Sequence, residues 1–221
     1  MENFDKVNNI FLTKDTNLKV NNGCPKAESR KPTTESLKLN GLILSGGMST
    51  RMGTEKRLLN YHGKSQEQYL YELMKPFCDE VFVSINANQQ TELPFIQDIE
   101  LAVKSPIVGI FSAFQQFPES AWLVIACDMP LVSQETIEFL LKNRNPEKYA
   151  TAFENPEEHF PEPLLTIFEA KFFEPLQVFI LQEKKSTMRL LQSLDIGLLQ
   201  IPDVKMLKNV NTVEEFNSFQ R

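Results

Sequence analysis

The stretch GLILSGGMSTRMGTEKR, residues Gly41 to Arg57, joins a short apolar run to a glycine-rich turn that is followed by cations. The apolar residues Leu42–Leu44 stop at Ser45-Gly46-Gly47, a pattern typical of a buried strand that ends in a tight loop. Glycines allow the backbone to turn where a Cβ would clash, and their N–H groups can face an anion. Because Arg51 and Lys56 follow closely, the loop is suited to binding a phosphate chain.

Two common phosphate-binding motifs do not fit this stretch. A Walker A loop needs a glycine five positions before Gly-Lys-Ser, and the Gly-Lys-Ser at Gly63 has Leu58 at that place. A Rossmann fingerprint needs G-x-G-x-x-G, which Gly46-Gly47 does not supply. A turn that merely links a strand to a helix would explain the glycines, but it would leave Arg51 and Lys56 unexplained.

The pattern GG-x-S-x-R-M-G-x-E-K resembles the signature loop of the molybdenum cofactor guanylyltransferases. These MobA-like proteins belong to the nucleotidyltransferases that act on sugar phosphates and cofactors. The usual family form is L-A-G-G-x-S-x-R-M-G-x-D-K, from which this chain departs at Ser45 and Glu55. The resemblance covers about residues 39–221 and implies that Leu44, Ser45, Gly46 and Gly47 contact a nucleotide.

Composition limits the classes of function. The 221 residues are 42% hydrophobic and 24% charged, as in an ordinary soluble domain, and the net charge of −6 argues against a broad nucleic-acid-binding surface. Three cysteines without C-x-x-C spacing indicate free thiols in a reducing compartment. Two histidines exclude a His-rich metal site, so we expect any metal to be Mg²⁺ held by carboxylates and phosphates.

The two ends of the sequence differ in character. Residues 1–38 are rich in Asn, Lys, Thr, Ser and Glu, and we expect a poorly ordered or loosely docked extension, or an adaptor for a partner. Residues 39–221 would form the nucleotidyltransferase domain. No apolar stretch approaches bilayer-spanning length and the N-terminus lacks a signal peptide's apolar core, which predicts a cytoplasmic protein without membrane contact.

Strand and helix patterns alternate as far as residue 145, which predicts an α/β fold: a three-layer sandwich with a mostly parallel, Rossmann-like sheet. The resemblance implies the nucleotide-diphospho-sugar transferase type of this fold. The expected strands after the first are Glu80–Ile85, a short one near Ile99–Val103, Trp122–Ala126, Tyr149–Phe153 and Leu164–Phe168. The expected helices are 66–77 capped by Ser65, one opened by Gly109, one capped by Ser133, 169–182, about 186–194, and one capped by Thr212.

Asp128 lies just past the continuous apolar run Trp122–Ala126, after Cys127, so its carboxylate would be held rigidly at the sheet edge. A divalent cation there could bridge the carboxylate and the phosphates of a nucleotide. Taken alone, Asp128 would be a turn or capping residue. The family carries a similar C-D-M-P segment whose Asp binds Mg²⁺, and this resemblance makes Asp128 the predicted metal ligand and a catalytic residue.

The cations of the loop would have different roles. Lys56 is a point charge suited to a triphosphate and its leaving group, whereas Arg51 can fork across phosphate oxygens. In the family, both positions act in nucleotide binding and catalysis. We expect Arg57 to be a solvated surface residue.

Further contacts come from the resemblance. Asn86 matches a nucleotide-contacting Asn after the second main strand, although a polar turn explains it almost as well. Gly109 would let the backbone approach the base or ribose. The family also has a nucleotide-contacting Asp before a G-P-L-x-G segment; residues 101–104 contain none, and Asp98 lies a strand's length away. Base specificity is therefore open.

The segment Asn209-Val210-Asn211-Thr212 resembles the family's N-V-N-T-P, which lies near the pterin substrate. Asn209 and Asn211 are therefore predicted pterin contacts, although a helix cap would also explain the segment. Glu162-Pro163, Lys185 and Arg189 are weaker candidates for the same face.

The leading hypothesis is transfer of GMP from GTP to molybdopterin with release of pyrophosphate, with Mg²⁺ as cofactor. A second hypothesis keeps the chemistry but uses CTP, or a sugar- or alditol-phosphate acceptor. A third is a non-catalytic chaperone that binds a cofactor for a molybdoenzyme. The expected partners are GTP and molybdopterin, with possible contact to a molybdoenzyme or a cofactor-delivery protein and none to nucleic acid or membrane.

Overall fold

The computed structural model of the chain describes residues 38–45, 55–156, 158–201, 203–207, 210, 215, 217 and 218. The chain divides into two units, Met1–Glu35 and Ser36–Arg221, and all described residues belong to the second. Of the predicted extension 1–38, only Lys38 is described, and the cap expected at Thr212 also lies outside the described residues. No helix in the described part of the chain is long and apolar enough to cross a membrane.

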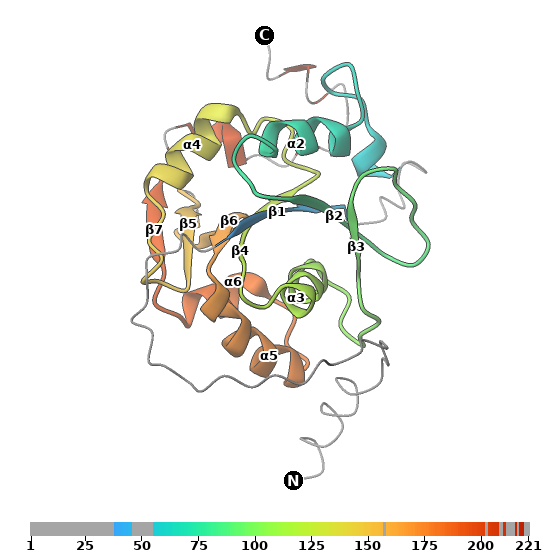
Figure 1. Cartoon of the computed structure of the whole chain (residues 1–221). Helices are drawn as coiled ribbons and strands as arrows, with labels where there is room; N and C mark the ends of the chain where they lie inside the picture. The colour runs from blue at the N-terminus through green and yellow to red at the C-terminus, as the bar shows by residue number, and fades with distance from the viewer. Residues whose placement is uncertain are drawn as a thin grey trace, which may run out of the picture. The chain divides into compact units, whose positions relative to one another are not determined.

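A seven-stranded sheet forms the middle layer, with the strand order β3-β2-β1-β4-β6-β5-β7 (Figure 1). All neighbouring pairs are parallel except those of β6, which runs antiparallel to both β4 and β5. The predicted α/β fold with a mostly parallel sheet is therefore confirmed. The strands are β1 (Leu39–Leu44), β2 (Val81–Ile85), β3 (Phe95–Gln97), β4 (Ala121–Ala126), β5 (Ala150–Glu154), β6 (Pro161–Phe168) and β7 (Gly197–Gln200).

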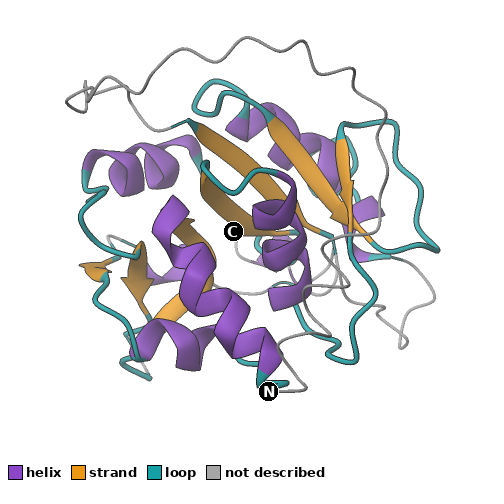
Figure 2. Cartoon of the chain, turned by 60° about the horizontal axis from the view of Figure 1, so that its bottom comes forward, coloured by secondary structure: helices purple, strands orange, loops and turns teal. Residues whose placement is uncertain are grey.

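Helices form the two outer layers: α2 and α4 cover one face of the sheet, and α3, α5 and α6 cover the other (Figures 1 and 2). Ser65, Ser133 and Ser186 cap three of them, because each side-chain oxygen accepts a hydrogen bond from a backbone N–H of the first turn. The helices are α2 (Gln66–Met74), α3 (Ile107–Gln116), α4 (Gln134–Lys142), α5 (Phe173–Leu181) and α6 (Thr187–Gln192), with 3₁₀ turns η1 (Lys56–Leu58), η2 (Ala170–Phe172) and η3 (Val204–Leu207).

The central strands β1 and β4 are buried along their whole length, as expected of strands covered on both faces. Trp122 of β4 is fully buried and meets the ring of Phe114 of α3 edge-on, with ring centroids 6.4 Å apart. Burial of these large side chains fixes α3 on the sheet, and with it the residues at the start of α3.

Two strand predictions differ from the structure. The strand expected near Ile99–Val103 is wrong: β3 lies at Phe95–Gln97, and the backbone N–H of Ile99 donates to Oγ of Ser112 in α3 instead of to a strand. The strand β7 was not predicted, because four residues beginning with Gly197 at a sheet edge give a weak pattern. Both errors concern short edge strands, in which neighbouring segments decide the pairing.

Candidate functional site

The carboxyl ends of β1, β2 and β4 lie side by side, because these strands are parallel neighbours in the sheet. The backbone N–H of Cys127 donates to the carbonyl of Leu44 at 3.1 Å, so the segment after β4 stays joined to the end of β1. In open α/β sheets, ligands bind outside such carboxyl ends. The polar residues that follow these strands therefore form the candidate site.

Lys56 and Asp128 meet at this edge, although they are far apart in the sequence. Nζ of Lys56 lies 3.5 Å from Oδ2 of Asp128, and the two side chains are 23% and 22% exposed. Lys56 lies in η1, and Asp128 follows β4. A partly exposed pair at this distance contributes little to stability.

The second carboxylate oxygen of Asp128, Oδ1, is buried and has no hydrogen-bond partner among the described residues. A buried, unpartnered carboxylate oxygen is a chemically suitable ligand for a hard cation such as Mg²⁺. No group of three or more His, Cys, Asp or Glu side chains in the described part of the chain could hold a metal ion. A cation bound to Asp128 would therefore need phosphate oxygens and water to complete its coordination.

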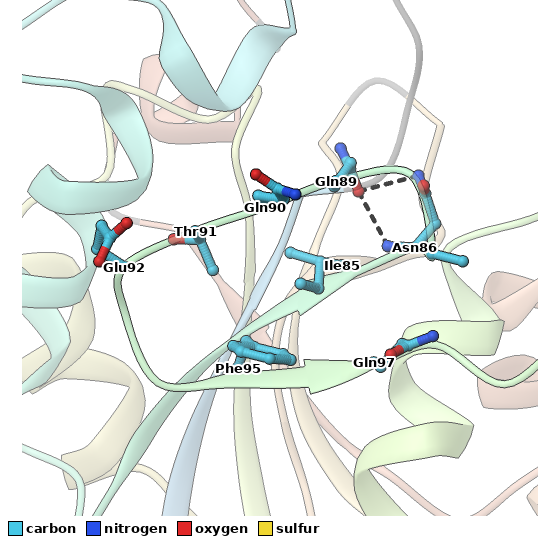
Figure 3. Close-up of a pocket in the computed structure, with 9 residues that line it drawn as sticks. Ile85, Asn86, Gln89, Gln90, Thr91, Glu92, Phe95 and Gln97 are labelled. Atoms are coloured by element: carbon cyan, nitrogen blue, oxygen red, sulfur yellow. Dashed lines mark hydrogen bonds between the residues drawn. The ribbon is translucent and has the colours of Figure 1, made fainter.

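Asn86 follows β2 and lies in a hydrogen-bonded corner with Ser45 and Gln89. Both the backbone N–H and the Nδ2 of Asn86 donate to Oε1 of Gln89, at 3.0 and 2.9 Å, and Oγ of Ser45 approaches the same oxygen at 3.4 Å. Ser45 also donates to the carbonyl of Ser84. A cavity of about 310 Å³ opens beside this corner, between the loop after β2 and Phe95 (Figure 3).

Gly109 packs α3 against the end of β2. A Cβ at this position would clash with Oγ of Ser84 and would come within 2.9 Å of Cδ2 of Leu44. Close helix–strand packing therefore requires glycine here, independently of any nucleotide. The predicted role of Gly109 in nucleotide binding stays a prediction.

The sequence does not indicate Asp98 as a site residue, because it predicts the edge strand near Ile99–Val103 and not at Phe95–Gln97. Asp98 directly follows β3, and its Oδ1 accepts a hydrogen bond of 2.6 Å from Oγ of Ser84, beside Gly109. Burial raises the pKa of Asp98, and the hydrogen bond from Ser84 opposes this shift. A correct placement of β3 would have shown Asp98 as a further strand-end carboxylate.

The prediction that Arg57 is a solvated surface residue is wrong. Its side chain is 4% exposed and donates to Oε2 of Glu55 at 2.5 Å and to Oε2 of Glu67, in α2, at 2.8 Å. The hydrogen bond from Arg57 lowers the pKa of Glu55. Two carboxylates explain the buried guanidinium, since a buried charge requires partners. The sequence near Arg57 shows only Glu55, because Glu67 comes from the following helix.

The C-terminal motif is attached to Asp128 through Val210. The backbone N–H of Val210 donates to the carbonyl of Asp128 at 2.8 Å, and the hydroxyl of Tyr61 donates to the carbonyl of Val210 at 3.3 Å. Val210 is fully buried in a small cluster with Tyr61. Its chain neighbours Asn209 and Asn211, the predicted pterin contacts, lie outside the described residues, as do Gly46, Gly47 and Arg51.

Two other side chains interact with the segment that contains Asp128. Nε2 of His62 lies 2.9 Å from the carbonyl of Pro130, and its ring stacks on Tyr69 with centroids 3.7 Å apart. Since a carbonyl only accepts, Nε2 of His62 carries the proton. Burial raises the pKa of Glu162, one of the weaker candidates; the hydrogen bond from the backbone N–H of Leu164 opposes this shift, and the charge of Asp128 adds to it.

The model of the MobA-like NTP transferase domain matches residues 41–197, which include the signature loop, Asn86 and Asp128. The chain belongs to this family. The MobA-like family consists of nucleotidyltransferases, so the chain is a member of a nucleotidyltransferase family, as the signature loop suggested.

Individual relatives agree with this assignment. The chain is 30% identical to the "Molybdenum cofactor biosynthesis bifunctional protein" of Synechocystis, over 95% of this chain and 60% of that protein. It is 28% identical to a "Probable molybdenum cofactor guanylyltransferase" of Bacillus cereus, over 82% of this chain and 95% of that protein. The fold is similar to that of "Molybdopterin-guanine dinucleotide biosynthesis protein A" from Archaeoglobus fulgidus, with a TM-score of 0.67, 24% identity, and coverage of 81% and 95%.

Proposed function

We propose that this MobA-like protein transfers GMP from GTP to molybdopterin and releases pyrophosphate. The observation that carries the proposal is the approach of Lys56 to Asp128 within 3.5 Å at the carboxyl edge of the sheet. A cation suits a triphosphate, and a carboxylate with one oxygen that has no partner among the described residues suits its metal. The name of the Bacillus cereus relative supports guanylyl transfer in particular.

In this proposal, Asp128 would hold Mg²⁺ through its carboxylate, and the bound ion would supply positive charge to the triphosphate. Lys56 lies beside Asp128 and stabilises the negative charge that builds up on the departing pyrophosphate. The terminal phosphate of molybdopterin attacks the α-phosphorus, a new P–O bond forms, and the α–β bridging bond breaks. Because the attacking phosphate is already an anion, no general base is needed, and catalysis depends on alignment and charge.

We also propose that Asp98 contacts the base. It follows β3 and accepts a hydrogen bond from Ser84, against which Gly109 of α3 packs. A carboxylate accepts hydrogen bonds, and guanine presents two donors, N1–H and the 2-amino group, on one edge. This would give the chain the nucleotide-contacting Asp that residues 101–104 lack.

The test is incubation of the purified protein with Mg²⁺, molybdopterin and each of GTP, CTP, ATP and UTP. We expect pyrophosphate and a guanine dinucleotide product with GTP. A product with CTP instead of GTP would make CTP the donor. A product only in parallel reactions in which a sugar phosphate takes the place of molybdopterin would make the sugar phosphate the acceptor. Tight binding of GTP without any pyrophosphate release would support a cofactor-binding chaperone instead.

A further inference from the structure

The side-chain amide of Gln89 joins both ends of the signature loop. Ser45 precedes and Glu55 follows residues 46–54, which carry Gly46, Gly47 and Arg51. Oγ of Ser45 lies 3.4 Å from Oε1 of Gln89, and Nε2 of Gln89 donates to Oε2 of Glu55 at 2.7 Å. One side chain from the loop after β2 therefore contacts the residues on either side of the signature loop.

The same amide also fixes Asn86, the predicted nucleotide contact. Its Oε1 accepts both hydrogen bonds from Asn86, which Figure 3 shows as dashed lines. The orientation of the Gln89 amide follows from its partners, because a backbone N–H can only donate and the carboxylate of Glu55 can only accept. The interaction therefore requires an oxygen that accepts on the Asn86 side and an N–H that donates on the Glu55 side, and the amide of Gln89 supplies both.

Glu55 is itself firmly held. Its Oε2 accepts from Arg57 as well as from Gln89, and Arg57 is paired in turn with the nearly buried Glu67 of α2. The far end of the loop is therefore tied to a helix of the outer layer. Gln89 is only partly buried and lies in a surface turn, where its N–H donates to the carbonyl of Asn86 at 3.1 Å. Its side chain can be changed without opening the core.

We propose that Gln89 is a positioning residue that holds the two ends of the nucleotide-binding loop in register with Asn86 and so sets the affinity for the nucleotide. The proposal rests on the nucleotidyl-transfer function above. Gln89 acts through Ser45, Glu55 and Asn86. Loop ends and an amide donor that are held in place before the ligand arrives lose less entropy on binding, which increases affinity.

The first experiment compares Gln89→Met with the control Gln90→Met in titrations with GTP and Mg²⁺ and in steady-state kinetics. Gln90 is the exposed neighbour in the same loop. For Gln89→Met we expect Kd and KM for GTP to rise about tenfold, the loss expected for a hydrogen bond to a charged group. We expect kcat to stay within about threefold, because neither Lys56 nor Asp128 is a hydrogen-bond partner of Gln89.

The second experiment uses Gln89→Glu, which replaces the amide with a titratable group of the same shape. Of the charged side chains in the described part of the chain, Glu55 accepts a hydrogen bond from Gln89, and Arg57 and Glu67 of α2 lie behind Glu55. At about pH 8, two carboxylates would face each other and binding should be weaker than in Gln89→Met. At about pH 5.5, a shared proton restores a donor toward Glu55, and the ratio of the variant's Kd to the wild-type Kd should fall. For Gln89→Met this ratio should not change with pH.

The outcomes separate the two proposals. A wild-type protein that binds no nucleotide would overturn the proposed function and this inference together. A wild type that binds GTP, with Gln89→Met binding equally well or losing kcat at unchanged Kd, would overturn the inference alone. A Kd ratio for Gln89→Glu that is flat with pH would also contradict the donor role of the Gln89 amide, even if Gln89→Met were too unstable to measure.

Discussion

The two ends of the candidate site are built on different physical principles. At the ends of β1 and β4, Lys56 and Asp128 are partly exposed, and Oδ1 of Asp128 has no hydrogen-bond partner in the part of the chain that the structure describes. At the ends of β2 and β3, Asn86, Gln89 and Asp98 are already hydrogen-bonded to neighbouring residues. The difference indicates that the carboxylate of Asp128 is open to a ligand at the first end, whereas the side chains of the second end are organised before the ligand arrives.

The largest effect is expected at Asp128. Replacement by Ala should lower kcat by about a thousandfold or more, because the metal ligand and its charge are lost together. Nucleotide binding measured by calorimetry should also lose its dependence on Mg²⁺. Asp128→Asn is the matched control for shape. An Asp128→Ala protein that keeps full GMP transfer would refute the metal assignment.

Lys56→Ala should reduce kcat by about a hundredfold, as for the loss of one group that stabilises charge in the transition state. The melting temperature should change little, because the pair with Asp128 is partly exposed and contributes little to stability. Lys56→Arg keeps the charge and tests whether its position matters. Normal kcat in Lys56→Ala would show that charge at this end of the site is not catalytic.

Arg57→Met should act on stability, because it leaves Glu67 buried without its partner. We expect a loss of about 3 kcal/mol in the free energy of unfolding, measured in urea. A double variant that also carries Glu67→Gln should recover part of this loss. If Arg57→Met alone were as stable as the wild type, the buried pair would not support the loop end.

Asp98→Asn sharpens the comparison at the hydrogen-bonded end. An amide presents a donor as well as an acceptor, so the preference for GTP over CTP in kcat/KM should fall by about tenfold or more. Ser84→Ala, which removes the hydrogen bond to Asp98, should have a smaller effect in the same direction. An unchanged preference would remove Asp98 from base recognition.

The smallest effect is a pH dependence at His62. Burial lowers the pKa of His62, so the folded state binds its proton less tightly than the unfolded state. Stability is therefore lost as pH falls below the ordinary His value of about 6.5 and the unfolded state gains the proton. Between about pH 7.5 and 5.5, the melting temperature of the wild type should fall more than that of His62→Gln. If the melting temperatures of the two proteins fell equally, the titration of His62 would not account for the loss of stability.

The sequence predicted the parts of the molecule that depend on local pattern. The apolar runs of β1 and β4 predicted central strands, because burial on both faces demands them. The signature loop and the segment after β4 predicted that Lys56 and Asp128 would share a site. The structure brings them within 3.5 Å, and their roles in metal binding and catalysis stay predictions.

Partners that come from separate elements could not be predicted. The burial of Arg57 depends on Glu67 of α2, the amide of Gln89 depends on Ser45 and Glu55, and the place of Asp98 depends on where the edge strand β3 pairs. Sequence alone determined the family, the central strands of the sheet and the charged motifs, because hydrophobic pattern and residue chemistry are local properties. Only the tertiary structure decided which polar and charged side chains form hydrogen bonds and ion pairs with one another. A hydrogen bond depends on the distance between two atoms, and the order of residues along the chain does not give that distance.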